Sequence, residues 1–383
     1  MIAIIKKSTY DALIEKILYV TYFIHQFTFV FSASQLSRAI PSLNKLLDVI
    51  MILTFLVIIL GDFYYFLRGK FSVKEIIIYI LIAIPLLISF VHYRVVMVFA
   101  NIFAISCFKN VDVKKILKVY LIATIAGCVL NVLISIFTKY TFNQETARYG
   151  VTRIRYGLGF YWVTFLSHYF YSIVFIYILY KQKLTNVDYV WIMIINILLF
   201  VANDTKAVFL FTILLLIIEF ILNRKYNEII YNIFGVMTMF SFILGGLTSF
   251  LLSYFYDETN KIMYRINEIL SGRLALMHRG LEHWGFNLWG QTISIKETGN
   301  TIDSSMVSML MQNGLIVYII CIGFMTYFAY LVYKKKWLPV LIALFAVAIR
   351  STFDLGFMAL QFGPVVVLFY LVLNSKEIEK INL

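Results

Sequence analysis

The feature that most constrains this chain is a succession of apolar runs, each about as long as a lipid bilayer is thick. The hydrocarbon core of a bilayer is roughly 30 Å thick and is crossed by about 20 helical residues. About twelve such runs follow one another, at 17–33, 46–67, 75–91, 94–108, 116–138, 158–180, 188–202, 205–222, 229–256, 305–333, 337–353 and 356–374. These runs leave little sequence for an independent soluble domain.

Composition agrees with this interpretation. Hydrophobic residues make up 62% of the 383 residues, charged residues make up 14%, and the mean hydropathy is +0.87. In hydrocarbon every backbone polar group needs a partner within its own segment, so the apolar runs are expected to be helices. We therefore predict an all-α integral membrane protein in which 1–383 form one polytopic membrane domain of about 12 transmembrane helices.

The basic residues are scattered between the apolar runs and form no continuous block, so the net charge of +13 does not indicate a nucleic-acid partner. The three cysteines, Cys107, Cys128 and Cys321, lie inside apolar runs without metal or redox spacing and are interpreted as packing residues. We expect no metal site and no cofactor.

An even number of spans places both termini on the same side, and the 33 basic residues divide unequally between the two sides. The connections on the terminal side carry seventeen Lys and two Arg, and the opposite connections carry five Lys and nine Arg. The terminal side therefore carries nineteen basic residues and the opposite side fourteen. This excess of basic residues on the terminal side predicts that both termini are cytoplasmic in a multi-pass protein of the cytoplasmic membrane.

The outer side holds most of the arginines. A guanidinium group binds phosphate oxygens two at a time and costs less to desolvate than an ammonium group. We therefore predict an anion site on the outer side. The alternative is that these arginines reach lipid headgroups or pair with loop glutamates such as Glu145, Glu268, Glu282 and Glu297.

Two outer connections are longer than the others, at 139–157 and 257–303. The first contains Arg148, Arg153 and Arg155 and leads into Gly157 and Gly159 at the expected start of a span. Glycines there would let a backbone approach a bulky anion beside a helix N-terminus.

A polar break of four residues, Asn203 to Lys206, separates two apolar runs. Asp204 and Lys206 would lie near headgroup level, where unpaired charge is costly, so they are expected to pair or to face a cavity. An ordinary tight turn is the alternative.

The long outer connection has a periodic apolar pattern. From Arg265 to Trp284, apolar residues recur every three or four positions, which predicts an amphipathic helix along the membrane surface. His278 and Glu282 would meet on this helix, and His278 is a candidate acid or base rather than a zinc ligand. Asp303 is either the N-cap of the next span or a base at the mouth of a cavity.

The order of these features resembles the capsular polysaccharide and O-antigen polymerase (Wzy) family and, more distantly, O-antigen ligases. The similar elements are Arg155-Tyr156-Gly157-Leu158-Gly159-Phe160, Asn203-Asp204-Thr205-Lys206, Ser271-Gly272-Arg273-Leu274, Trp289-Gly290, Ile302-Asp303-Ser304-Ser305 and Asn313-Gly314. The family often has Ser-Arg where Thr205-Lys206 stands here. The resemblance implies a GT-C-like, metal-independent glycosyltransferase that joins repeat units carried on undecaprenyl diphosphate outside the cytoplasmic membrane.

Such a reaction needs cations for the leaving diphosphate and a base for the acceptor hydroxyl. We assign the diphosphate to Arg153, Arg155, Arg273 and Arg279, supported by Lys206. Asp303 is the first candidate for the base and His278 the second. A chain-length regulator and a flippase are expected partners.

Two other classes of protein fit the same layout. A lipid-linked oligosaccharide flippase or another multi-pass transporter would also carry cationic sites, although those sites should lie within the spans along a central path. If the protein is a non-catalytic scaffold or sensor, replacing any single outer arginine should leave its function unchanged.

Overall fold

The computed structural model describes residues 9–68, 112–148, 151–224, 227–270, 272–293 and 302–354, together with single residues 73, 77 and 80. The predicted spans at 75–91, 94–108 and 356–374 lie outside the described residues, apart from 77 and 80. The described part is mostly helical, and six of its helices are long and apolar enough to cross a membrane: α3 (Pro41–Leu67), α6 (Val113–Phe137), α8 (Asn186–Asn203), α9 (Lys206–Arg224), α10 (Glu228–Tyr254) and α14 (Ser305–Lys334).

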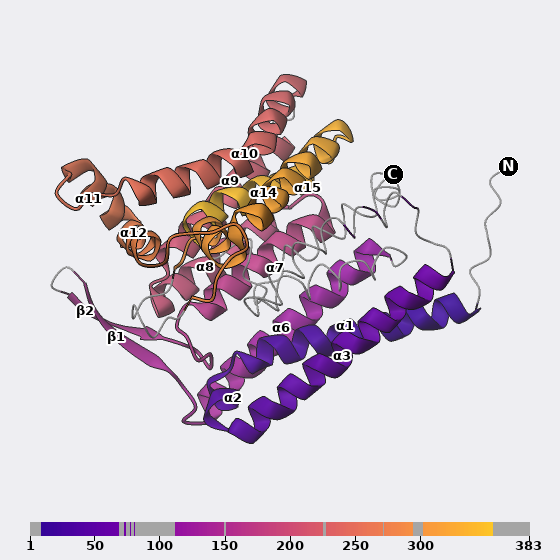
Figure 1. Ribbon diagram of the computed structural model, residues 1–383. Coiled ribbons are helices and arrows are strands. Elements are labelled where there is room, and N and C mark those ends of the chain that lie inside the picture. The colour runs from indigo at the N-terminus through magenta and orange to yellow at the C-terminus, as the bar shows by residue number, and fades with distance from the viewer. Residues whose placement is uncertain are drawn as a thin grey trace.

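The described part of the bundle includes three further apolar helices, namely α1 (Thr9–Ser32), α7 (Phe165–Lys181) and α15 (Leu338–Phe353). Helix α1 packs against α3 and α6, α6 packs against α7, and α7 contacts α8, α9 and α15. Helices α10, α14 and α15 pack against one another on the far side of the bundle (Figure 1). The main hydrophobic core runs through these contacts.

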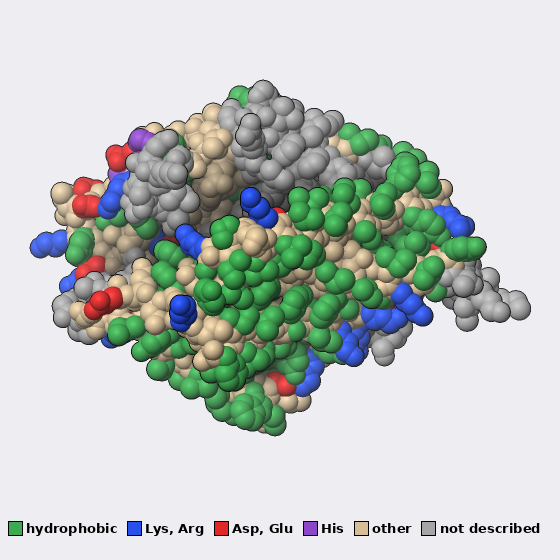
Figure 2. All heavy atoms as spheres, turned by 90° about the horizontal axis from the view of Figure 1, so that it is seen from below, with side chains coloured by type: hydrophobic (Ala, Val, Ile, Leu, Met, Phe, Trp, Pro, Cys, Tyr) green, Lys and Arg blue, Asp and Glu red, His purple; other side chains and the backbone are tan. Residues whose placement is uncertain are grey.

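The lateral surface of the bundle along α3, which would face the lipid chains, is apolar. Large side chains of α3, such as Ile52, Leu56 and Leu60, are exposed along its length. Figure 2 shows a broad hydrophobic face on which charged side chains gather toward the two ends. The protein is therefore membrane-embedded.

One end of the bundle carries the only strands among the described residues, and we call it the hairpin end. Strands β1 (Asn143–Arg148) and β2 (Val151–Tyr156) form an antiparallel hairpin in which Gln144 pairs with Arg155. The short helices α2 (Gln35–Ala39), α11 (Lys261–Ile269) and α12 (Arg273–Trp284) lie at the same end (Figure 1). The sequence predicted only a loop at 139–157, so this hairpin is a new element.

The segment after the hairpin differs from the prediction. Helix α7 begins at Phe165, later than the expected 158. Gly159 has a φ of +87°, and a Cβ there would lie 1.9 Å from the Asn131 carbonyl oxygen of α6. A Cβ at Gly157 would lie 2.5 Å from the carbonyl oxygen of Phe142. These glycines allow protein backbones to meet, which is a different role from the predicted approach to an anion.

The predicted continuous helix from Arg265 to Trp284 is wrong, because α11 and α12 are separate helices. Gly272 stands between them with a φ of +86°, a left-handed conformation that an α-helix cannot contain. Leu274, Met277 and Leu281 of α12 are buried against residues of α14. The apolar stripe of α12 therefore faces protein, whereas α11 buries no residue.

Helix α14 is interrupted at Gly314, which has a φ of +86° and a ψ of 166° inside the helix. The loop before it fills the interruption. The Leu315 amide donates to the Asn287 carbonyl at 2.9 Å, and the Gln291 amide donates to the Gln312 carbonyl at 3.0 Å. The loop and the broken helix thus satisfy each other's backbone groups.

Candidate functional site

Two groups of polar side chains lie at the hairpin end of the bundle, and residues of α7 touch both. The first group joins the hairpin to the turn between α8 and α9. Arg155 Nε donates to the Asn203 carbonyl at 2.7 Å, and Arg153 Nη1 lies 3.5 Å from Asp204 Oδ1. Arg155 is partly buried, whereas the side chain of Arg153 is 57% exposed. The first group is therefore more open to solvent at Arg153 than at Arg155.

The turn between α8 and α9 explains why Asp204 can meet an arginine. Asp204 closes α8 in a left-handed conformation with a φ of 47°, and its amide donates to the Phe200 carbonyl. Both predictions for this segment hold in part, since it is a tight turn and its aspartate is paired. Lys206 is exposed at the first position of α9.

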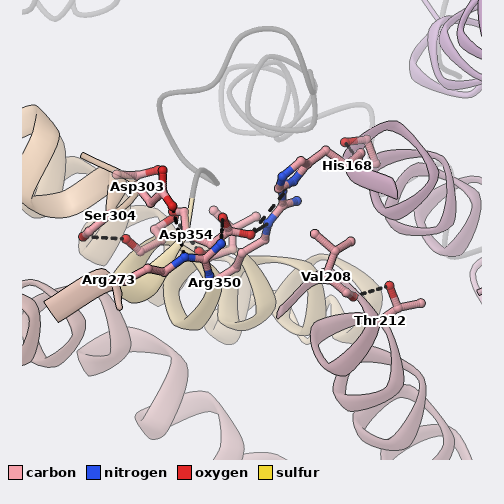
Figure 3. A network of polar contacts seen from close by, with 12 residues as sticks. His168, Val208, Thr212, Arg273, Asp303, Ser304, Arg350 and Asp354 are labelled. Carbon is pink, nitrogen blue, oxygen red and sulfur yellow. Dashed lines mark hydrogen bonds and ion pairs between the residues drawn. The ribbon is translucent and has the colours of Figure 1, made fainter. Parts of the chain in front are cut away.

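The second group is a buried network of charged residues drawn from four elements (Figure 3). Arg273 of α12 binds two carboxylates, with its Nε 3.2 Å from Asp303 Oδ2 and its Nη2 3.1 Å from Asp354 Oδ1. Arg350 of α15 lies with its Nε 3.4 Å from Asp354 Oδ2. Arg350 Nη2 also donates to His168 Nδ1 of α7. Two arginines thus share one aspartate.

Burial increases from one side of this network to the other. The Asp303 and Arg273 side chains are 28% and 15% exposed, whereas Arg350 and Asp354 are each 1% exposed. The Arg350 guanidinium also lies over the Tyr171 ring, 4.4 Å from its centroid, which stabilises a cation in a dry environment. The network therefore has an accessible side at Asp303 and an enclosed side at Arg350.

Local backbone geometry fixes the carboxylates of this network. The N-cap of α14 is Ser304, whose Oγ accepts from the Val307 amide and donates to the Thr352 carbonyl at 2.9 Å. The Ser305 amide and hydroxyl both donate to the Asp354 carbonyl. The alternative prediction that Asp303 caps this helix is therefore wrong, because Ser304 caps it and the Asp303 side chain pairs with Arg273.

Adjacent residues of α7 connect the two groups. Ser167 Oγ donates to Asn203 Oδ1 at 3.3 Å, while the next residue, His168, contacts Arg350. Because Nδ1 of His168 accepts a hydrogen bond from a guanidinium group, this nitrogen carries no proton. The imidazole is therefore neutral, and the two groups meet across α7 without an added charge.

His278 and Arg279 lie on other faces of α12. His278 Nδ1 lies 2.8 Å from the Ser253 carbonyl, to which it must donate, and its Nε2 lies 3.3 Å from Glu282 Oε1. The predicted meeting of His278 and Glu282 is confirmed. This ring ties α12 to the end of α10, whereas Arg279 is exposed.

The turn that leads into α11 is held by a carboxylate. Asp257 accepts from the Thr259 amide and hydroxyl, each at 2.8 Å, and these donors lower the pKa of Asp257. Asn260 then caps α11 by accepting from the Ile262 and Met263 amides. The path from α10 to α12 is therefore set by polar contacts near the predicted site residues.

Sequence reasoning brought together Arg273 with Asp303, and Arg153 with Arg155, but it missed three members of the buried network. His168, Arg350 and Asp354 stand within or directly after apolar runs, where an ionisable residue is costly and marks a functional site by default. That signal was present in the sequence. In the described part of the chain, no cluster of three His, Cys, Asp or Glu side chains is arranged to hold a metal ion.

No family model, no curated protein and no solved structure matches this chain. The resemblance to polysaccharide polymerases thus stays a prediction. What the chain can do follows from the geometry of the two polar groups. In a pair made of a cation and an accessible carboxylate, the cation can bind an anion and the carboxylate can accept a proton. Both polar groups lie at one end of an apolar bundle.

An open groove of about 600 Å³ lies elsewhere, between α10 and α14. Phe240, Ile319 and Tyr327 are among its lining residues, and all three are exposed. Its lining is apolar and lies on a different stretch of α14 from Ser304. The groove therefore suits a hydrocarbon chain rather than a charged headgroup.

Proposed function

We propose that this protein is a membrane-embedded glycosyltransferase that joins glycan repeat units carried on undecaprenyl diphosphate, outside the cytoplasmic membrane. The observation that carries the proposal is the pairing of Arg273 with Asp303, whose Nε and Oδ2 atoms are 3.2 Å apart at the accessible side of a buried charge network. The reaction needs a cation and a base close together, and this pair supplies both.

The chemistry assigns separate roles to Arg273 and Asp303. The acceptor hydroxyl attacks the anomeric carbon of the donor glycan, a new carbon–oxygen bond forms, and the bond to the diphosphate breaks. Negative charge grows on the departing diphosphate, where a positioned guanidinium group stabilises the transition state. Arg273 is assigned to this charge, and Asp303 is assigned to the acceptor proton.

The hairpin arginines extend the cationic surface at the same end. Arg153 and Arg155 bind the turn between α8 and α9, and Lys206 is exposed beside that turn. Arg279 is exposed on α12. We propose that these four residues attract and orient the diphosphate headgroup. His278 remains the second candidate for the base, although its ring nitrogens already face the Ser253 carbonyl and Glu282.

The test is elongation of a lipid-linked repeat unit by purified protein in nanodiscs, without nucleotide and without added metal. Arg273→Lys keeps the charge but loses the planar fork, and Asp303→Asn removes the base. We expect each variant to lose roughly 100-fold or more in rate. Arg265→Ala is the matched control, because Arg265 lies at the same end and, among the described residues, pairs with Glu268 on the surface of α11. Wild-type rates in both site variants would refute the assignment.

A second function is favoured by a specific observation. Arg350, Asp354 and His168 are buried within the bundle, and α14 is broken at Gly314. Buried charges and discontinuous helices are typical of transport paths. A lipid-linked oligosaccharide flippase is therefore the alternative. Translocation of the lipid-linked unit across a proteoliposome membrane, with no elongation, would support it over the polymerase.

A further inference from the structure

Asp354 holds two arginines at once, with one carboxylate oxygen for each. Its Oδ1 lies 3.1 Å from Arg273 Nη2, and its Oδ2 lies 3.4 Å from Arg350 Nε. Asp303 supplies a second carboxylate to Arg273. Because His168 is neutral, two arginines balance two aspartates among the described residues of this network.

The two carboxylates that bind Arg273 differ in how far they depend on its charge. The Asp354 side chain is 1% exposed, so it needs a protein cation at all times, and Arg350 remains beside it as that cation. Asp303 is 28% exposed, so solvent can stabilise its carboxylate without Arg273. The contact to Asp303 is therefore the one that Arg273 can give up.

Arg273 also has donors to spare. A guanidinium group has five N–H bonds in a fixed planar fork. One nitrogen, Nη2, points to Asp354 and another, Nε, points to Asp303. If Nη2 stays on Asp354, the Nε edge can turn from a carboxylate oxygen to a phosphate oxygen with little motion of the side chain.

We infer that Arg273 is an exchange point, at which an incoming diphosphate displaces Asp303 while Asp354, itself bound by Arg350, holds the guanidinium in place. The inference rests on the proposed function, since the anion is the lipid diphosphate of the donor. Arg350 and Asp354 are positioning residues, because they act through Arg273. Binding of the donor thereby releases the base that the reaction needs.

The exchange orders the steps of the transfer. Donor binding moves Arg273 from Asp303 to the diphosphate, which opens the carboxylate oxygen that faced Arg273 to the acceptor hydroxyl. The acceptor hydroxyl then gives its proton to Asp303 as its oxygen bonds to the anomeric carbon. The diphosphate leaves with the electron pair of the broken bond, and its charge is met by Arg273.

The test measures the affinity of purified full-length protein in nanodiscs for undecaprenyl diphosphate, using calorimetry. Asp303→Asn removes the competitor of the ligand, so we expect binding to tighten about 5-fold or more relative to wild type. Glu268→Gln is the matched control, because Glu268 is 25% exposed and pairs with Arg265 at 2.9 Å, outside the network. We expect this control to bind like wild type.

The positioning residues should act in the opposite direction. Asp354→Asn and Arg350→Lys each loosen the anchor of Arg273, so binding should weaken about 10-fold. Arg350→Lys retains the charge, so it keeps the test open if Asp354→Asn does not fold. A purely structural role for the network would weaken binding in every variant, and it would not tighten binding in Asp303→Asn.

The outcomes separate this inference from the proposed function. If wild type binds and elongates glycan but Asp303→Asn binds no tighter than Glu268→Gln, the exchange is refuted and the function stands. If the variants follow the expected pattern but no elongation occurs, the exchange stands and the polymerase is refuted. If wild type does not bind undecaprenyl diphosphate at all, both are refuted.

Discussion

The buried pair of Arg350 and Asp354 makes a strong prediction about stability. Asp354→Asn keeps the size of the side chain but removes its charge, leaving Arg350 buried at 1% exposure with a neutral amide and a neutral histidine as neighbours. Breaking a buried ion pair from one side costs about 3–5 kcal/mol, because the remaining charge is not compensated. We expect a loss of this size in the free energy of unfolding.

A double substitution distinguishes a buried charge from a lost contact. Replacing Arg350 with Met and Asp354 with Leu together removes both charges, and Arg273 keeps its bond to Asp303. Apolar replacements of a buried pair are often neutral or stabilising. The double variant should therefore unfold less readily than Asp354→Asn, even though it changes more atoms.

The free energy of unfolding can be measured in bicelles by steric trapping. Glu228→Gln is the matched control, because Glu228 pairs with Lys336 at 3.0 Å while both side chains are more than half exposed. A surface pair contributes about 0–1 kcal/mol, so the control should change little. If Asp354→Asn costs no more than Glu228→Gln, the network is not a buried charge system and the reasoning fails.

Two further predictions concern the loop at the helix break and the hairpin. Gly290→Ala should abolish the accumulation of folded protein, because Gly290 has a φ of +91° and a Cβ there would lie 2.2 Å from the Gln312 carbonyl oxygen. Gly323→Ala is the control and should accumulate normally, because no packing neighbour in the described part of the chain lies within 4 Å of a Cβ at Gly323. Equal yields of monodisperse protein on size exclusion would contradict this. Under the proposed function, Arg155→Ala should shorten the polymer made in cells more than Arg153→Ala does, because Arg155 is partly buried on the Asn203 carbonyl at 2.7 Å, while Arg153 is 57% exposed. Equal polymer lengths on a gel, at equal protein levels, would contradict the second prediction.

In the part of the chain that the structure describes, the helices could be predicted well because each apolar run there corresponds to one. The run at 116–138 corresponds to α6 (Val113–Phe137), and the run at 205–222 corresponds to α9 (Lys206–Arg224). The hairpin could not be found in this way. Its strands carry polar residues on both faces, for example Thr152 and Arg153 on neighbouring positions, so they lack the alternation that identifies a half-buried strand.

The broken helices show a second limit. The stripe from Arg265 to Trp284 keeps a helical period across Leu270 and Gly272, so periodicity alone predicts one helix. The structure ends the first helix before Gly272 because its left-handed conformation turns the chain, and α12 then buries its stripe against α14. A glycine inside a periodic pattern was the available warning.

The candidate site was predictable in part. Arg273 and Asp303 lie in the long polar connection at 257–303, where the sequence predicts a site on the outer side. His168, Arg350 and Asp354 lie within or directly after apolar runs, away from the polar connections that predict the site. His168 of α7 and Arg350 of α15 are in contact although 182 residues separate them in the sequence. Sequence spacing cannot reveal such a contact.

The position of the network at helix ends explains how a membrane-embedded bundle tolerates it. Arg350 lies in the last turn of α15, where the helix dipole favours a cation. Asp303 lies just before α14, where the dipole favours an anion, and the Ser305 amide binds the Asp354 backbone. These helix ends stabilise the separate charges, but an apolar contact at the same place would cost less. A bundle that keeps two arginines and two aspartates there gains no stability that leucines could not provide. The retained charges therefore favour a role in ligand binding over a role in folding, and the accessible side of Arg273 is where that ligand would meet them.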